Sequence, residues 1–300
     1  MTTTALTRMS ATAALLGIAV SFAASAPPAS GMRSATVREV SIAYRAYDGH
    51  LSHATVLLPE WYGPQRNPAL PLVISPHGRG LDGQANGRRF GDLPAVGGFI
   101  VVNPDGEGSH LSGRFSWGAP GQIDDLARMP EIVSAALPWL RIDPRRIYAV
   151  GGSMGGQETL LLLARHPRLL AGAVAIDPVV DFARQFRSSE GERGATLRRL
   201  ARSEVGGTPS TNPHAFAVRS PITYAAAIAS SGVPLQLWWT RTDQIVVHSE
   251  LQSGLLATRI RALNPDAPLT EVVGDWRHTA AMRAETSLAT MLVGLGLLPS

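Results

Sequence analysis

Short apolar runs rich in β-branched residues alternate with stretches of helical periodicity along most of the chain. The later apolar runs are continuous, which is typical of strands buried on both faces of a mainly parallel sheet. No helical stretch separates the first two runs, so we expect an antiparallel edge there. The predicted strands are Val37–Tyr44, Ala54–Leu58, Leu72–Ser75, Phe99–Val102, Ile147–Val150, Ala171–Ile176, Leu235–Trp239 and Thr270–Val273.

The stretches between these strands predict helices. Apolar residues recur at helical spacing over Ile123–Leu140 and Met154–His166, and again over residues 248–263 and 278–294. Strands that alternate with helices predict an α/β fold with right-handed crossovers. We therefore expect a mainly parallel eight-stranded sheet flanked by helices, within one catalytic domain over residues 32–300.

The N-terminal residues have the pattern of a secretory signal. Arg8 is followed by an apolar run, Ala11–Ala24, and by small residues up to Gly31. That run is shorter than the roughly 20 residues that span a bilayer. We expect residues 1–31 to be a cleaved signal peptide and the protein to be secreted, extracellular or periplasmic, with no stable membrane insertion after cleavage. An uncleaved anchor is the alternative.

Composition narrows the possible classes of protein. The chain has 300 residues with a 45% hydrophobic fraction, which is enough apolar material for one large core. Cysteine is absent, so disulfides and thiolate metal sites are excluded. All of the basic residues are arginine, yet the net charge is only +4 and no basic stripe is interleaved with aromatic residues. We therefore expect no nucleic-acid partner.

Residues 182–220 interrupt the alternation between the sixth and seventh predicted strands. The segment is rich in arginine, with glycine and serine between the basic residues. A lid-like insertion over the active site is one interpretation, and a solvated surface helix with a loop is the other. The arginines are Arg184, Arg187, Arg193, Arg198, Arg199, Arg202 and Arg219.

A candidate nucleophile lies between the fifth strand and the helix that follows it. Residues 151–155 read Gly-Gly-Ser-Met-Gly, which matches the nucleophile-elbow pattern G-x-S-x-G. The strand–turn–helix setting is the one that this motif requires. Glycines at 151 and 155 are expected because side chains there would clash with the neighbouring backbone. We predict Ser153 as the nucleophile, the alternative being a serine that only caps the helix.

A base and an acid follow Ser153 in the order Ser, Asp, His. His278 lies past the eighth strand and Asp243 past the seventh, at the strand ends where active sites of open α/β sheets form. His278 is predicted to take the serine proton, and Asp243 to orient the imidazole. Asp177 and Asp275 are the alternative acids.

Attack on a carbonyl group also requires two N–H donors for the developing oxyanion. The backbone N–H of Met154 is expected to be one donor, because it follows the nucleophile. The other should come from residues 77–80, His-Gly-Arg-Gly, after the third strand. We favour the N–H of Arg79, with that of Gly80 as the alternative. The loop could instead be a glycine turn with no part in catalysis.

These motifs together resemble the catalytic domain of the prolyl oligopeptidase family within the α/β-hydrolase superfamily. The resemblance extends from about Val37 to the C-terminus and includes the HG loop at 77–78, residues 143–147 before the elbow, residues 152–156 and 220–222, and the loops of Asp243 and His278. It implies the α/β-hydrolase fold and serine hydrolase chemistry, for esterases or peptidases alike. The HG loop lacks the double glycine, and the chain has no room for the β-propeller of the family's peptidases. Both departures favour an esterase.

We therefore expect a secreted serine hydrolase that cleaves carboxylic esters, small or polymeric, through an acyl-Ser153 intermediate, with no cofactor and no metal. A peptidase or amidase of the same mechanism, acting on peptides, is the first alternative. A non-catalytic binding protein on the same fold is the second. The arginine-rich segment also suggests an anionic substrate.

Overall fold

The computed structural model describes residues 36–107, 116–189 and 191–300. Its centre is an eight-stranded sheet, in which β3 and β4 are completely buried. β1 alternates between exposed and buried positions near its end, as expected for an edge strand. The strands are β1 Val37–Arg45, β2 Leu51–Pro59, β3 Leu70–Ile74, β4 Ile100–Pro104, β5 Ile142–Gly152, β6 Gly172–Ile176, β7 Leu235–Thr240 and β8 Leu269–Gly274.

The order of the strands is β1-β2-β4-β3-β5-β6-β7-β8. β1 and β2 pair antiparallel, β2 pairs antiparallel with β4, and the remaining neighbours are parallel. This is the mostly parallel sheet of the α/β-hydrolase fold, so the predicted fold and its antiparallel edge are confirmed. All eight predicted strands overlap strands of the sheet.

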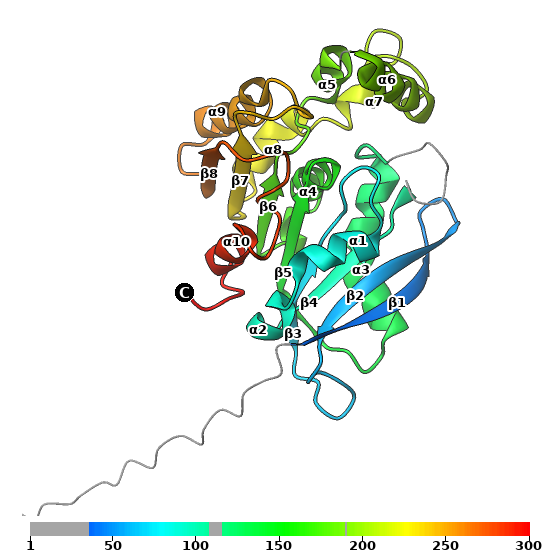
Figure 1. Ribbon diagram of the computed structural model, residues 1–300, viewed down its shortest axis with the longest axis vertical. Helices are drawn as coiled ribbons and strands as arrows, with labels where there is room; N and C mark the ends of the chain where they lie inside the picture. Colours follow the sequence, from blue (N-terminus) through cyan, green and yellow to red (C-terminus); the bar gives the residue numbers. More distant parts are fainter. Residues whose placement is uncertain (1–35, 108–115, 190) are drawn as a thin grey trace, which may run out of the picture. The chain divides into compact units, whose positions relative to one another are not determined.

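Helices cover both faces of the sheet (Figure 1). One apolar cluster joins the sheet to α3, α4, α8 and α9, and a second joins its other face to α2 and α10. The longer helices are α3 Pro120–Ala136, α4 Met154–Arg165, α6 Gly191–Val205 and α9 Ser253–Leu263. The shorter ones are α1 Gly83–Gly87, α2 Leu93–Gly97, α5 Phe182–Ser188, α7 Pro213–Ala217, α8 Ala225–Ser230 and α10 Leu288–Gly294, with 3₁₀ turns η1 Arg88–Phe90, η3 Pro167–Leu169, η4 Pro221–Tyr224 and η5 Ser249–Leu251.

The helix predicted over residues 278–294 is wrong in its first half. The chain runs through turns after His278, and α10 begins only at Leu288. Thr279 has a φ of 55°, which no right-handed helix accommodates. The apolar residues at helical spacing there, including Ala281 and Met282, instead pack from the loop into the second apolar cluster.

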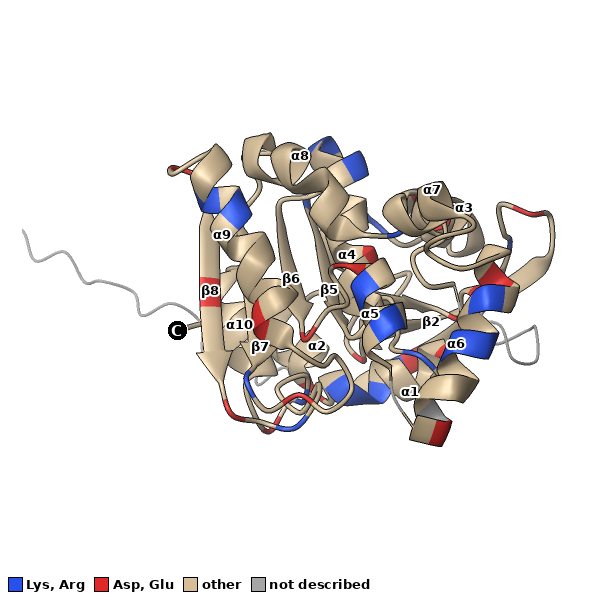
Figure 2. Cartoon of the chain, turned by 90° about the horizontal axis from the view of Figure 1, so that it is seen from above, with Lys and Arg blue, Asp and Glu red and all other residues tan. Residues whose placement is uncertain are grey.

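The described residues of the 182–220 segment form a packed helical insertion between β6 and β7. Phe182 of α5 stacks between Trp117 and Phe216 of α7, with ring centroids 5.1 and 4.9 Å apart. The Val180 carbonyl accepts a hydrogen bond from the Ile222 N–H, which ties the two ends of the insertion together. Figure 2 shows basic residues on α5 and α6, and Arg187 and Arg202 lie in their last turns. A role as a lid stays a prediction.

The predicted signal peptide over residues 1–31 lies outside the described residues. Among the helices that the structure describes, none combines the length and the apolar character needed to cross a bilayer.

Candidate active site

Ser153 occupies a sharp turn between the end of β5 at Gly152 and the start of α4 at Met154. Its backbone has φ 60° and ψ −122°, a conformation that non-glycine residues rarely adopt. Its N–H donates to the carbonyl of Ile176 on the neighbouring strand at 2.8 Å. The turn has the geometry of a nucleophile elbow, with Ser153 at the carboxyl edge of the sheet.

The glycines beside Ser153 are required by close backbone approach. A Cβ atom at Gly151 would overlap the carbonyl of Gly155, and a Cβ atom at Gly155 would overlap the carbonyl of Pro76. Gly78 of the HG loop also lies against the turn, where a Cβ atom would be 3.7 Å from the Ser153 Cβ. The glycine requirement predicted from the motif is therefore confirmed at 151 and 155.

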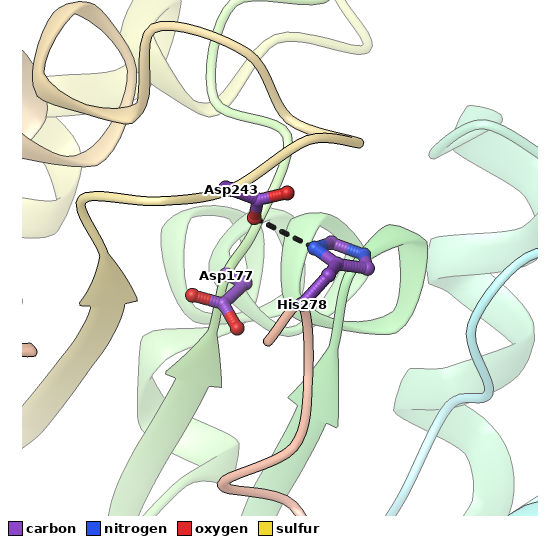
Figure 3. Close-up of side chains that lie close together, drawn as sticks. All are labelled: Asp177, Asp243 and His278. Carbon is purple, nitrogen blue, oxygen red and sulfur yellow. Dashed lines mark hydrogen bonds and ion pairs between the residues drawn. The ribbon is translucent and has the colours of Figure 1, made fainter. Parts of the chain in front are cut away.

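His278 lies between Ser153 and Asp243, although the three residues are far apart in the sequence. The Ser153 Oγ is 2.8 Å from His278 Nε2, and the Asp243 Oδ2 is 2.7 Å from His278 Nδ1. An ionised carboxylate can only accept, so Nδ1 carries the proton and Nε2 accepts from the serine hydroxyl. The structure thus brings together the three residues proposed from sequence, and Figure 3 shows the histidine–aspartate pair.

Asp243 is held in place by its own loop. Its Oδ1 accepts hydrogen bonds from the backbone N–H groups of Ile245 and Val246, at 2.7 and 2.9 Å. The other oxygen is left for His278, and the carboxylate is almost fully buried, with 1% of the side chain exposed. The arrangement fixes the orientation of the imidazole in a protected environment.

The two alternative acids have other partners. Asp275 is exposed, with an ion pair of 3.3 Å to Arg241. Asp177 is buried and accepts hydrogen bonds from the N–H groups of Thr240 and Thr279. Burial raises the pKa of Asp177, although the Thr279 hydrogen bond and the nearby imidazole of His278 act in the opposite direction. Of the three acids, Asp243 is the one that hydrogen-bonds to the imidazole of His278.

Asp177, Asp243 and His278 also form a group of donor atoms that could hold a metal ion, since these atoms lie within 4.8 Å of one another. Each of the three side chains already has hydrogen-bond partners within the protein. The Asp177 oxygens accept three hydrogen bonds, and His278 Nδ1 is directed at Asp243. These hydrogen bonds explain why the three side chains lie together: they form a network that orients His278 (Figure 3).

The two residues proposed for the oxyanion hole border the nucleophile. Met154 begins α4 directly after Ser153, so its N–H belongs to the first turn of the helix. Arg79 lines the cavity into which Ser153 opens, and its guanidinium lies 5.7 Å from the ring centroid of Trp117. The assignment of their N–H groups to an oxyanion hole stays a prediction.

His77 has a structural place in the same loop. It is buried, with one ring nitrogen 2.8 Å from the carbonyl oxygen of Gly78 and the other 2.5 Å from that of Asp105. The imidazole thus links the HG loop to the chain after β4. This agrees with the sequence analysis, which assigned the chemistry to His278 alone among the histidines.

Two cavities adjoin these residues. The smaller, of about 200 Å³, contains Ser153 and His278 and is bordered by the HG loop and by Met282. The larger, of about 700 Å³, lies between the α5–α6 region and residues 243–248. Ile245 borders both cavities, so the loop that carries Asp243 contributes to each of them.

Sequence reasoning missed two groups near the site. Arg89 borders the cavity of Ser153, and Glu158, on the helix after the elbow, is completely buried beside Ser116. Burial raises the pKa of Glu158 to about 8. A carboxylate inside the apolar pattern of the helix was a signal that could have identified Glu158. Arg89 had no such signal, because only the fold brings it to the cavity.

The fold and the contacts between Ser153, His278 and Asp243 define a serine hydrolase of the α/β-hydrolase class. Residues 93–255 match the family model described as "Prolyl oligopeptidase family". The chain therefore belongs to the prolyl oligopeptidase family.

The proteins that this chain resembles in sequence or in fold carry the names of esterases and of peptidases. The chain is 30% identical over 152 residues to "Putative esterase NocK" of Nocardia uniformis subsp. tsuyamanensis, a match that covers 47% of this chain and 40% of that protein. Dipeptidyl peptidase 4 of Porphyromonas gingivalis is 19% identical with a TM-score of 0.62, over 86% of this chain and 35% of that one. An esterase of the archaeon Pyrobaculum calidifontis is 19% identical with a TM-score of 0.63, and the match covers 87% of this chain and 84% of that one. The two structural matches concern the fold alone.

Proposed function

We propose that the protein hydrolyses carboxylic esters through an acyl intermediate on Ser153. The observation that carries this proposal is the unbroken hydrogen-bond chain from the Ser153 hydroxyl through His278 to Asp243. A serine hydroxyl is a weak nucleophile until a base takes its proton, and His278 Nε2 lies within reach of that proton.

The reaction has two halves. Ser153 Oγ attacks the ester carbonyl carbon and transfers its proton to His278 Nε2, which gives a tetrahedral oxyanion. The carbon–oxygen bond to the alcohol then breaks, and His278 donates the proton to the departing oxygen. Water next gives a proton to His278 and attacks the acyl group, which releases the carboxylic acid and returns the proton to Ser153.

The backbone N–H groups of Met154 and Arg79 are our candidates for stabilising the oxyanion. Both residues border Ser153, and Gly78 allows close approach of the HG loop to the turn. Gly80, with a φ of 76°, is the alternative donor in the same loop. Loss of one such donor typically lowers the rate by about 10² to 10³.

An ester preference is supported by the relative "Putative esterase NocK" and by arginine at position 79, where the double-glycine form of the loop would have glycine. The family membership keeps a peptidase as the second candidate. Matched aminoacyl 4-nitrophenyl esters and 4-nitroanilides test the choice. The proposal predicts faster turnover of the ester after correction for intrinsic reactivity, and faster turnover of the anilide would identify a peptidase.

A non-catalytic binding protein is a further alternative, which a fluorophosphonate probe separates from both enzymes. A catalytic serine in this setting should react covalently with the probe. Absence of labelling would favour the binding protein.

We also propose that the protein is exported and that residues 1–31 are removed. The apolar run Ala11–Ala24, with Arg8 before it and small residues after it, supports this proposal. N-terminal sequencing of the protein recovered outside the cytoplasm tests it. A retained Met1 in the exported protein would indicate an anchor instead.

A further inference from the structure

The cavity that contains Ser153 has an unbalanced charge. Two arginines, Arg79 and Arg89, line it together with the imidazole of His278. Among the described residues that border this cavity, none is an aspartate or a glutamate. A small cavity of about 200 Å³ that is bordered by basic residues and by no acidic residue among the described ones favours an anion over a neutral group.

Arg89 is the more informative of the two arginines. Within residues 36–107, 116–189 and 191–300 its guanidinium makes no hydrogen bond or ion pair, whereas Arg165, for example, pairs with Asp124 at 3.0 Å. Burial lowers the pKa of Arg89, and the positive charge of Arg283 lowers it further. A guanidinium nonetheless stays charged at any usual pH, so Arg89 is a half-buried cation that a bound anion would stabilise.

The position of the cavity indicates which part of a substrate would meet Arg89. His278, Thr279 and Met282 border the cavity, and the carbonyl of Arg89 accepts a hydrogen bond of 3.1 Å from the N–H of Ala284 in the loop that follows His278. His278 must protonate the departing oxygen, so the alcohol part of an ester lies on the histidine side of Ser153. The aromatic cluster of Trp117, Phe182 and Phe186 borders a different cavity, and among the described residues Arg79 is the one that borders both.

We propose that the natural ester carries a carboxylate on its alcohol part and that the guanidinium of Arg89 binds this carboxylate. Guanidinium and carboxylate groups match in geometry and form paired, charge-assisted hydrogen bonds. The inference rests on the proposed ester hydrolysis at Ser153 and adds to it a class of leaving group. Arg89 would therefore be a specificity residue, with no direct part in bond cleavage.

The test compares two acetate esters that differ in one charge. In 4-acetoxybenzoate the leaving phenol bears a carboxylate, and in methyl 4-acetoxybenzoate the same position is neutral. The measured quantity is the ratio of kcat/KM for the anionic ester to kcat/KM for the neutral ester. Because this ratio is compared between protein variants, the intrinsic reactivities of the two esters cancel.

We expect Arg89→Gln to lower this ratio by about 10- to 100-fold, which is the usual effect of losing a hydrogen bond to a charged group. Arg89→Lys should retain part of the preference for the anionic ester, since the positive charge remains. Arg88→Gln is the matched control, because Arg88 is the exposed neighbour in the same turn and does not border the cavity. An equal ratio in the wild type and in Arg89→Gln would overturn the proposal.

A binding measurement separates this proposal from the proposed function. The product 4-hydroxybenzoate should slow fluorophosphonate labelling of the wild type and of Arg88→Gln, and should have at least tenfold weaker effect on Arg89→Gln. If labelling occurs but neither ester is hydrolysed, ester hydrolysis is wrong, and the protection pattern still decides the role of Arg89. Equal protection of all three proteins would overturn that role.

Discussion

The carboxylate of Asp177 accepts a hydrogen bond of 2.7 Å from the backbone N–H of Thr279, the residue after His278. The same oxygen accepts from the indole N–H of Trp276 at 3.1 Å, and the other oxygen accepts from the N–H of Thr240 at 2.9 Å. Asp177 therefore joins the end of β6, the end of β7 and the loop that carries the histidine.

Replacement of Asp177 by alanine should destabilise the protein and displace His278. The buried N–H of Thr240 would lose its acceptor, which costs about 1–3 kcal/mol, and the part-buried N–H of Thr279 would lose its acceptor as well. We expect a lower free energy of unfolding in urea, together with a lower kcat on a neutral ester. Asp275→Ala is the control on the same loop, because its ion pair with Arg241 is exposed. Equal effects of the two substitutions would contradict this role of Asp177.

Asp243→Asn should lower kcat by up to about 10⁴-fold while the fold is retained. The asparagine carbonyl can still accept from the N–H groups of Ile245 and Val246, so the loop is preserved. Its amide would no longer stabilise the imidazolium of His278. Steady-state kinetics measure the loss of kcat, and circular dichroism measures whether the fold is retained. Wild-type turnover in Asp243→Asn, or a comparable loss in Asp275→Asn, would show that the acid is assigned wrongly.

The contact between Ser153, His278 and Asp243 could be predicted from the sequence because the three residues lie at strand ends. Ser153, Asp243 and His278 each follow a strand whose apolar pattern is unmistakable, and parallel strands bring their carboxyl ends to one edge. The loop after His278 was interpreted as helix because the spacing of its apolar residues does not reveal the positive φ of Thr279. Arg89 lies 64 positions before Ser153, so its place at the cavity depends on tertiary packing that no local pattern encodes.

Glu158 should make the stability of the protein depend on pH. Burial raises its pKa to about 8, against the hydrogen bonds from Ser116 and from the Gly118 N–H, and the charge of Glu107 adds to the increase. The folded state therefore holds a proton that the unfolded chain releases near its ordinary value of 4.5. The stabilisation that the folded state gains from holding this proton on Glu158 is complete below about pH 4.5 and is lost as the pH rises through about 8.

Thermal unfolding between pH 5 and pH 9 tests this dependence. The wild type should lose stability on the order of a few kcal/mol across that range. Glu158→Gln keeps the shape of the side chain without the charge, so its profile should be flatter and its stability at pH 8 at least as high. Glu131→Gln, at an exposed position of α3, is the control and should follow the wild type. Parallel profiles for all three proteins would refute the assignment.

The backbone of Ser153 should store strain that can be removed. A φ of 60° with ψ −122° costs a non-glycine residue about 1–3 kcal/mol, and glycine adopts it freely. Ser153→Gly should therefore have a higher free energy of unfolding than Ser153→Ala, and unfold at a higher urea concentration. Glycine also adds entropy to the unfolded chain, which opposes the gain, so we expect a net difference of about 1 kcal/mol. Both variants lack the hydroxyl, so a difference between them reports the backbone alone. Equal midpoints would indicate an unstrained turn.

The central claim is that Ser153 is the nucleophile of an ester hydrolase. The most direct measurement follows hydrolysis of a neutral 4-nitrophenyl ester by the wild type and by Ser153→Ala, together with the intact mass of each protein after fluorophosphonate treatment. We predict that the wild type gains one phosphonyl group and loses activity, and that Ser153→Ala gains none and turns over about 10⁴- to 10⁶-fold more slowly. Wild-type activity in Ser153→Ala, or a phosphonyl group on another residue, would contradict the claim.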